Sequence, residues 1–114
     1  MIDFHTDITT SLNKILPTYY ELILHSGIPT PCISYMELSN VDDATGDTLG
    51  YSRLQYQIKV WGNDIAVLQQ YALEIDKAMR ALGFKRTGAT ELHDYQSTMI
   101  QKIMTYEALA SEVF

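Results

Sequence analysis

Apolar and polar residues alternate through the middle of the chain, and their period changes after one glycine. In the segment from Tyr51 to Trp61, apolar residues take every second position from Leu54 to Val60, as in a strand with one buried face. After Gly62 they recur at steps of three and four, as on one side of a helix. The pattern predicts a helix packed across a strand, with a core made of Leu54, Tyr56, Ile58, Val60, Ile65, Leu68, Ile75, Met79 and Leu82.

The two ends of this helix carry residues suited to its free backbone groups. Asn63 or Asp64 can cap the start, because a short side-chain oxygen accepts a hydrogen bond from a free N–H. Gly83 is placed to close the helix in the left-handed conformation. Lys77 and Arg80 lie near the C-terminal end, where the helix dipole favours cations.

The segments on either side predict a second helix and four more strands. The last strand carries apolar residues on both faces, which indicates either a central strand or a sheet whose second face meets another subunit. The expected class is α+β, in one domain over 1–114, with a mainly antiparallel sheet and both helices on one face, in the order α-β-β-β-α-β-β. The expected elements are a helix over 3–15 stopped by Pro17, strands over 18–24, 32–38, 51–61, 84–92 (interrupted by Gly88) and 97–107, a loop over 25–31 and a turn over 93–96.

A long polar segment from Ser39 to Gly50 separates two of these strands and is predicted to be a loop. It is about twice the length of a common hairpin loop, and long loops in compact domains are often functional. Its residues are mostly small or acidic, so it buries little apolar surface by itself. We expect it either to become ordered against a partner during assembly or to remain a passive connection. The candidate assembly residues are Val41, Asp42, Asp43, Thr45, Gly46, Asp47 and Leu49.

Composition and charge narrow the class of protein. The chain has 114 residues, a formal net charge of −6 and one cysteine, which argues against an internal disulfide framework. Apart from Lys85–Arg86 the basic residues do not cluster, so the basic stripe of a duplex-binding protein is missing. An acidic protein can still surround DNA without adhering to it. No apolar run is long enough to span a membrane, and the acidic N-terminal residues do not resemble a signal peptide, which predicts a cytoplasmic site of assembly.

The residues that could support catalysis or metal binding are scattered. His5, His25 and His93 fall in different predicted elements, whereas a zinc site needs three or four converging ligands. Cys32 has no basic neighbour in sequence to lower its pKa and is expected to be a buried apolar residue. The acidic residues after Asn40 do not follow the spacing of an EF-hand loop. We therefore expect no enzyme activity, no cofactor and no metal.

Two other groups of residues have alternative interpretations. The eight tyrosines and five methionines suit either a core or a protein interface, where both residue types are enriched. Lys85 and Arg86 are expected to be charges on a strand edge, with a phosphate contact as the alternative.

Several segments of the chain together resemble one known family, the short tail-completion or tail-terminator proteins of tailed phages and prophages of Gram-positive bacteria. The resemblance extends over nearly the whole chain from Pro17 onward and rests on order and pattern rather than on a catalytic signature. The segments that carry it are Pro-Cys-Ile-Ser-Tyr at 31–35 with Glu37, Thr-Gly-Asp-Thr-Leu-Gly-Tyr-Ser at 45–52, Tyr-Gln-Ile-Lys-Val-Trp at 56–61, 75–76, 82–86 and Lys-Ile-Met-Thr-Tyr-Glu-Ala at 102–108.

The resemblance implies a structural virion protein with no active site. Such subunits form a hexameric ring at the head-proximal end of the tail tube, where the ring stops tube polymerisation and joins tail to head. The implied partners are further copies of this chain, the tail tube protein and the head-tail connector protein, with DNA passing through the lumen without specific binding and no membrane contact. The implied location is the tail or neck of the virion. The alternative within this class is a head-tail connector or head-closure protein, and the alternative outside it is a small enzyme or an antitoxin-like regulator.

Overall fold

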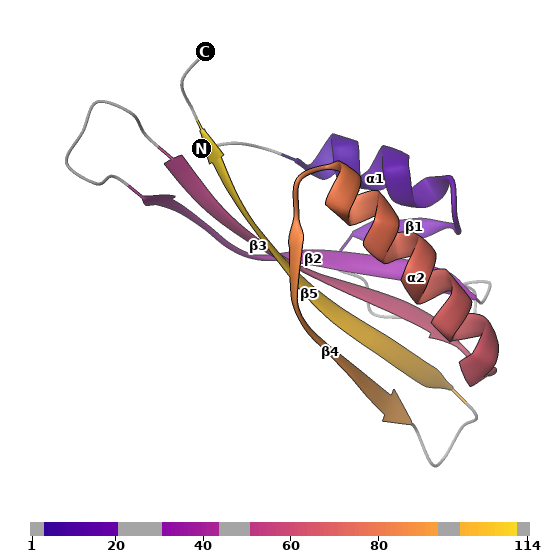
Figure 1. The fold of residues 1–114 in the computed structure, drawn as a ribbon. Helices are drawn as coiled ribbons and strands as arrows, with labels where there is room; N and C mark the ends of the chain where they lie inside the picture. The colour runs from indigo at the N-terminus through magenta and orange to yellow at the C-terminus, as the bar shows by residue number, and fades with distance from the viewer. Residues whose placement is uncertain (1–3, 21–30, 44–50, 94–98, 112–114) are drawn as a thin grey trace.

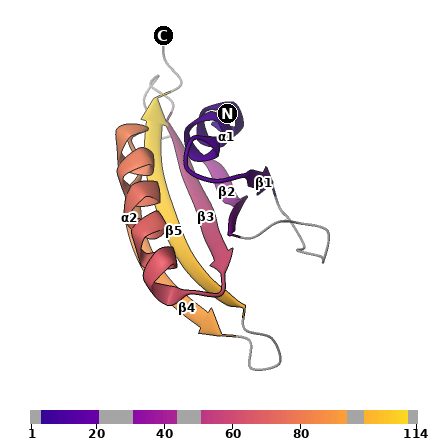
Figure 2. The same ribbon diagram turned by 90° about the vertical axis from the view of Figure 1, so that its right-hand side faces the viewer.

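Two helices lie on one face of a five-stranded sheet (Figure 1; Figure 2). The computed structural model describes residues 4–20, 31–43, 51–93 and 99–111, and of residues 40–43, 51, 52 and 109–111 it describes the backbone alone. The class α+β and the element order α-β-β-β-α-β-β are therefore confirmed. The elements are α1 (His5–Asn13), β1 (Thr18–Tyr20), β2 (Cys32–Asp43), β3 (Tyr51–Gly62), α2 (Ile65–Ala81), β4 (Lys85–His93) and β5 (Ile100–Ser111).

The strands lie in the order β1-β2-β3-β5-β4, and each pair is antiparallel except β1 with β2. The last strand of the chain, β5, is therefore a central strand between β3 and β4, as one interpretation of its two apolar faces predicted. The described part of β1 begins at Thr18, and residues 21–24 of the predicted strand lie outside the described residues, as do residues 25–30 of the predicted loop.

The core lies between the sheet and the two helices. Alternate β3 residues from Leu54 to Val60 are fully buried, and they pair with buried Tyr106 and Met104 of β5 and with Ile33 and Tyr35 of β2. From α2 the core receives a stripe of four buried side chains, Leu68, Ala72, Ile75 and Met79. Residues Ile8 and Leu12 of α1 pack into the same cluster, and Leu82 is partly buried against it.

One predicted core residue is misplaced. Ile65, the first residue of α2, keeps 37% of its surface exposed. The stripe has the right period, but residues 65–67 of the first turn are all exposed, and burial of the stripe begins only at Leu68.

Both predicted helix ends are present. Asp64, rather than Asn63, is the N-cap, and its carboxylate accepts a hydrogen bond from the Ala66 N–H at 3.0 Å. Gly83 follows the last turn with φ of 97°, the left-handed conformation that glycine adopts without a side-chain clash. The Phe84 N–H then bonds to the Met79 carbonyl at 3.0 Å, which turns the chain towards β4.

Gly83→Ala is expected to lower the free energy of unfolding by about 1 kcal/mol, because an L residue in this conformation is strained. The matched control is Gly88→Ala in β4, where an added Cβ meets no atom within 4 Å and φ is not positive. Denaturant titration of both variants is the measurement. Equal effects of the two substitutions would show that backbone conformation at Gly83 is not what stabilises the end of α2.

Three strands are longer or later than the sequence predicted. Residues 39–43 were expected in a loop, yet they continue β2 and pair with 51–55 of β3. The reason is a bulge between Glu37 and Ser39, which breaks the period-two pattern while backbone pairing continues beyond it. β5 likewise continues to Ser111 rather than ending at 107, and β4 includes His93, which was expected in a turn; residues 94–96 of that turn lie outside the described residues.

Candidate assembly surfaces

The far end of the sheet forms a three-stranded arm that extends beyond the helices (Figure 1). We define the β-arm as residues 40–43 of β2, 51–54 of β3 and 108–111 of β5. The register joins Asp43 to Tyr51 and Tyr51 to Ser111, so β3 is the central strand of the arm. The described pairing of β4 starts only at Lys85 with Glu107, so neither β4 nor β1 flanks the β-arm in the described part of the chain.

The candidate assembly residues divide between this arm and a segment outside the described residues. Val41, Asp42 and Asp43 lie on β2, opposite Arg53, Ser52 and Tyr51, so their expected place in a loop is wrong. The others, Thr45, Gly46, Asp47 and Leu49, lie outside the described residues. Three of the seven therefore belong to a hydrogen-bonded strand pair.

A second surface is formed where the end of α2 meets the start of β4. We define the basic edge as Lys77 and Arg80 of α2 together with Lys85 and Arg86 of β4, all of them exposed. The prediction that Lys85 and Arg86 are charges on a strand edge is confirmed, since β4 is an edge strand of the sheet and all nine of its residues are exposed. Beside these cations α2 presents Leu73, which is 63% exposed.

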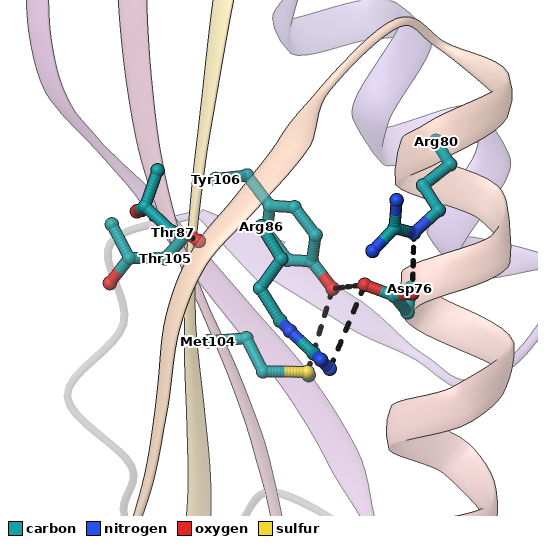
Figure 3. Close-up of polar contacts among 7 residues, drawn as sticks. All are labelled: Asp76, Arg80, Arg86, Thr87, Met104, Thr105 and Tyr106. Atoms are coloured by element: carbon teal, nitrogen blue, oxygen red, sulfur yellow. Dashed lines mark hydrogen bonds and ion pairs between the residues drawn. The ribbon is translucent and has the colours of Figure 1, made fainter.

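Asp76 fixes the two arginines of the basic edge (Figure 3). Its Oδ2 lies 2.7 Å from Arg80 Nε, one helical turn away, and its Oδ1 lies 3.8 Å from a terminal nitrogen of Arg86. The same Oδ1 accepts a hydrogen bond of 3.1 Å from the Tyr106 hydroxyl, which comes up from β5. One carboxylate thus ties α2 to β4 and β5 and holds two guanidinium groups in place at the surface.

The cluster also shifts two ionisation equilibria. Burial raises the pKa of Asp76, but hydrogen bonds from Arg80 and Tyr106 and the charges of both arginines outweigh it, so the pKa lies below its ordinary value. Burial, followed by the nearby charge of Asp76, raises the pKa of the Tyr106 hydroxyl well above its ordinary value. At neutral pH the group therefore consists of one carboxylate, two guanidinium ions and a neutral phenol.

The face of the sheet opposite the helices is a third surface, half-buried and mixed in chemistry. The Trp61 indole N–H donates to the Ser34 hydroxyl at 2.9 Å, and the Lys59 ammonium lies 5.8 Å from the centre of the Trp61 ring. Further along, the hydroxyl of Ser39 lies 3.2 Å from the Gln55 side-chain oxygen. Of the polar side chains predicted for this face of β3, Gln55 and Arg53 therefore meet side chains of the neighbouring strands, Ser39 and Glu107, whereas Lys59 lies beside Trp61 of its own strand.

The residues considered for catalysis do not converge. His5 Nε2 lies 3.3 Å from Glu37 Oε2 between α1 and β2, whereas His93 is on β4 near Glu91, and His25 lies outside the described residues. Cys32 is fully buried, and burial raises the pKa of its thiol. Within residues 4–20, 31–43, 51–93 and 99–111, no three side chains of the His, Cys, Asp and Glu types gather as metal ligands would.

The tyrosines divide between the two interpretations given for them. Tyr35, Tyr56 and Tyr106 are buried and belong to the core. Tyr20 remains 46% exposed, and its ring lies 4.7 Å from that of His5. Among the described helices, none is both long and apolar enough to cross a bilayer.

Sequence reasoning missed the Asp76 cluster. The spacing of Asp76 and Arg80 by four residues was a usable signal, because side chains at this spacing meet on a helix. Nothing in the sequence indicates that Arg86 and Tyr106 reach the same carboxylate, since β4 and β5 meet α2 only in the folded chain.

Comparison with known proteins gives a likeness of fold. No family model matches the sequence, and no curated protein matches it. Among solved structures, a chain of the virion of a native gene transfer agent (GTA) particle matches with a TM-score of 0.56 and 11% sequence identity. The match covers 91% of this chain and 84% of that chain, so the two chains share nearly their whole fold.

Proposed function

We propose that this chain is a structural virion protein of the phage type, and specifically a tail-terminator subunit. The observation that carries the proposal is the shared fold with a chain of the GTA virion, which extends over nearly the full length of both chains. It supports the class independently of the order of sequence segments from which the tail-terminator family was inferred.

In this role six copies form a ring at the head-proximal end of the tail tube. The ring ends tube polymerisation, joins the tail to the head connector and lets DNA pass through its lumen. Three features suit such a part: an arm of paired strands beyond the helices, a fully exposed edge strand β4, and a sheet face that neither of the described helices covers. The net charge of −6 also suits a passage for DNA, because like charge prevents adhesion.

The proposal includes the absence of catalysis. The chemically most reactive side chain, Cys32, is buried with a raised pKa, which disfavours the thiolate that acts as a nucleophile. His5 of α1 lies beside Tyr20 of β1, whereas His93 is on β4 at the opposite edge of the sheet, so the two histidines do not form a common site. The β-arm, the basic edge and the sheet face opposite the helices are surfaces on which other subunits could dock.

Electron microscopy of the purified protein, alone and with tail-tube subunits, tests this function. We expect rings of six subunits that cap one end of each tube and limit further growth. A ring that binds only DNA-filled heads and leaves tube growth unchanged would instead identify a head-tail connector or head-closure protein. A protein that neither forms rings nor binds tubes or heads would contradict both roles.

A further inference from the structure

Charged residues are distributed unevenly between the N-terminal and C-terminal parts of the chain. Residues 1–50 contain seven of the fourteen acidic residues but only one of the eight Lys and Arg residues, whereas residues 51–114 contain seven of each. The first part forms α1, β1 and β2, and the second forms β3, α2, β5 and β4. Among the described residues, α1 and β2 carry four acidic residues, Asp7, Glu37, Asp42 and Asp43, and the strand order β1-β2-β3-β5-β4 places β2 towards one edge of the sheet.

The opposite edge carries the cations in a fixed arrangement. Arg80 and Arg86 are held on Asp76, with 56% and 40% of their side chains exposed. The side chains of Lys77 and Lys85 are also exposed, and Lys85 is opposite Glu107 in the register. Four cations therefore gather where α2 meets β4, next to exposed Leu73 and a strand whose outer backbone groups have no partner strand among the described residues.

The complementary surface consists of the acidic residues on α1 and β2. We define the acidic side as Asp7 of α1 and Glu37, Asp42 and Asp43 of β2. Asp7 is exposed, and Glu37 is partly exposed beside His5. Asp42 and Asp43 lie in the β-arm, where β2 is an edge of the sheet. The one basic residue of this half, Lys14, follows α1.

We propose that the basic edge of one copy of this chain docks on the acidic side of the next copy. The two surfaces differ and lie towards opposite edges of one sheet, so the contact is head-to-tail and leaves both surfaces available at the ends of any open chain of copies. A contact between two basic edges would instead bring like charges together, which opposes association. This contact rests on the ring proposed above, and it names the residues that join neighbouring subunits of that ring.

Charge reversal on each surface separately tests the contact. Lys77→Glu with Lys85→Glu cancels the net positive charge of the basic edge and leaves the two arginines on Asp76. Asp42→Lys with Asp43→Lys cancels the net negative charge of the acidic side through two residues of β2. Assembly is followed by analytical ultracentrifugation and native mass spectrometry, alone and with tail-tube subunits. We expect each double variant to need at least about a tenfold higher concentration than the wild type to assemble, and the wild type to show a similar loss in 1 M salt, where the screening length falls to about 3 Å.

Mixing the two variants provides the sharper result. The proposed contact sets Lys77 and Lys85 against Asp42 and Asp43, so the new carboxylates of one variant then face the new ammonium groups of the other. Their unchanged surfaces also match, so assembly should return with equal numbers of each variant in alternation. A ring of six permits this alternation because its number of subunits is even. The matched control is Lys14→Glu, compared with Lys77→Glu alone: both change the net charge by the same amount, but Lys14 is exposed after α1, outside the basic edge, and its variant should assemble as the wild type does.

The outcomes distinguish this contact from the ring itself. Rings that form normally from each double variant would overturn the proposed contact and leave the ring intact. Loss of tube capping with normal rings would also overturn it, since the basic edge would then bind the tail tube. A wild-type protein that stays monomeric at low salt, alone and with tail tubes, would overturn both the contact and the ring. Circular dichroism of each variant shows that reversal has not unfolded the chain.

Discussion

Replacing Ile75 by alanine is expected to lower the free energy of unfolding by about 2–5 kcal/mol, the range found when a large aliphatic side chain is truncated in a closed core. Ile75 lies at the centre of the buried stripe of α2 and is fully buried among the sheet residues below it. Removing three methylene-sized groups there leaves a cavity that a central β-sheet cannot collapse to fill.

Leu73→Ala on the same helix is the matched control. Leu73 is 63% exposed, so its truncation should change the free energy of unfolding by less than about 0.5 kcal/mol. Urea titration followed by circular dichroism measures both variants under one condition. A near-zero change for Ile75→Ala, or a larger change for Leu73→Ala, would mean that α2 presents a different face to the sheet.

Asp76→Ala is expected to lower the free energy of unfolding by about 1–3 kcal/mol at neutral pH. The substitution removes the acceptor of the Tyr106 hydroxyl and of Arg80 Nε, and leaves the hydroxyl with only the Met104 sulfur at 3.5 Å. A buried hydroxyl without a good partner costs about this amount. Chemical denaturation of the variant, with Glu74→Ala as an exposed carboxylate on the same helix, is the measurement.

The pH dependence of stability distinguishes the charge of Asp76 from its shape. Its pKa is lower in the folded chain than its ordinary value of 3.8, so the unfolded chain binds the proton more readily. The stability that Asp76 contributes is therefore present above its ordinary pKa and is lost as the pH falls through the lowered folded pKa. Asp76→Asn keeps the shape without the titration and should lose less stability than the wild type between about pH 5 and pH 3. Parallel curves for the two proteins would contradict this role.

The centre of the fold was predictable from sequence because local pattern and burial agree there. The alternating residues of β3 have one buried face, and the α2 stripe from Leu68 to Met79 repeats at the helical period. Asp64 and Gly83 end the helix for reasons that lie in their own backbone preferences. These features depend on residues within a few positions of one another.

The β-arm was mistaken for a loop because the prediction followed side-chain pattern. Residues 39–43 are polar except for Val41 and follow a bulge, so they show no alternation and little apolar content. Their strand is decided by backbone pairing with 51–55, and backbone hydrogen bonds do not depend on which side chains are present. A bulge of one residue also reverses the faces on which later side chains lie, which removes the signal that sequence analysis uses.

The sequence by itself determined the order of helices and strands and the buried residues of β3 and α2, because period and capping are local properties. Only the tertiary structure decided that β5 enters the sheet between β3 and β4, that Ile65 stays exposed at the start of α2, and that Asp76 gathers Arg80, Arg86 and Tyr106. The uneven distribution of charged residues is visible in the sequence, but only the strand order shows that β2 and β4, which carry acidic and basic residues, lie towards opposite edges of the sheet. The physical reason is the same in each case: neighbours across a sheet are far apart in sequence, and no local preference records which strand will lie beside which.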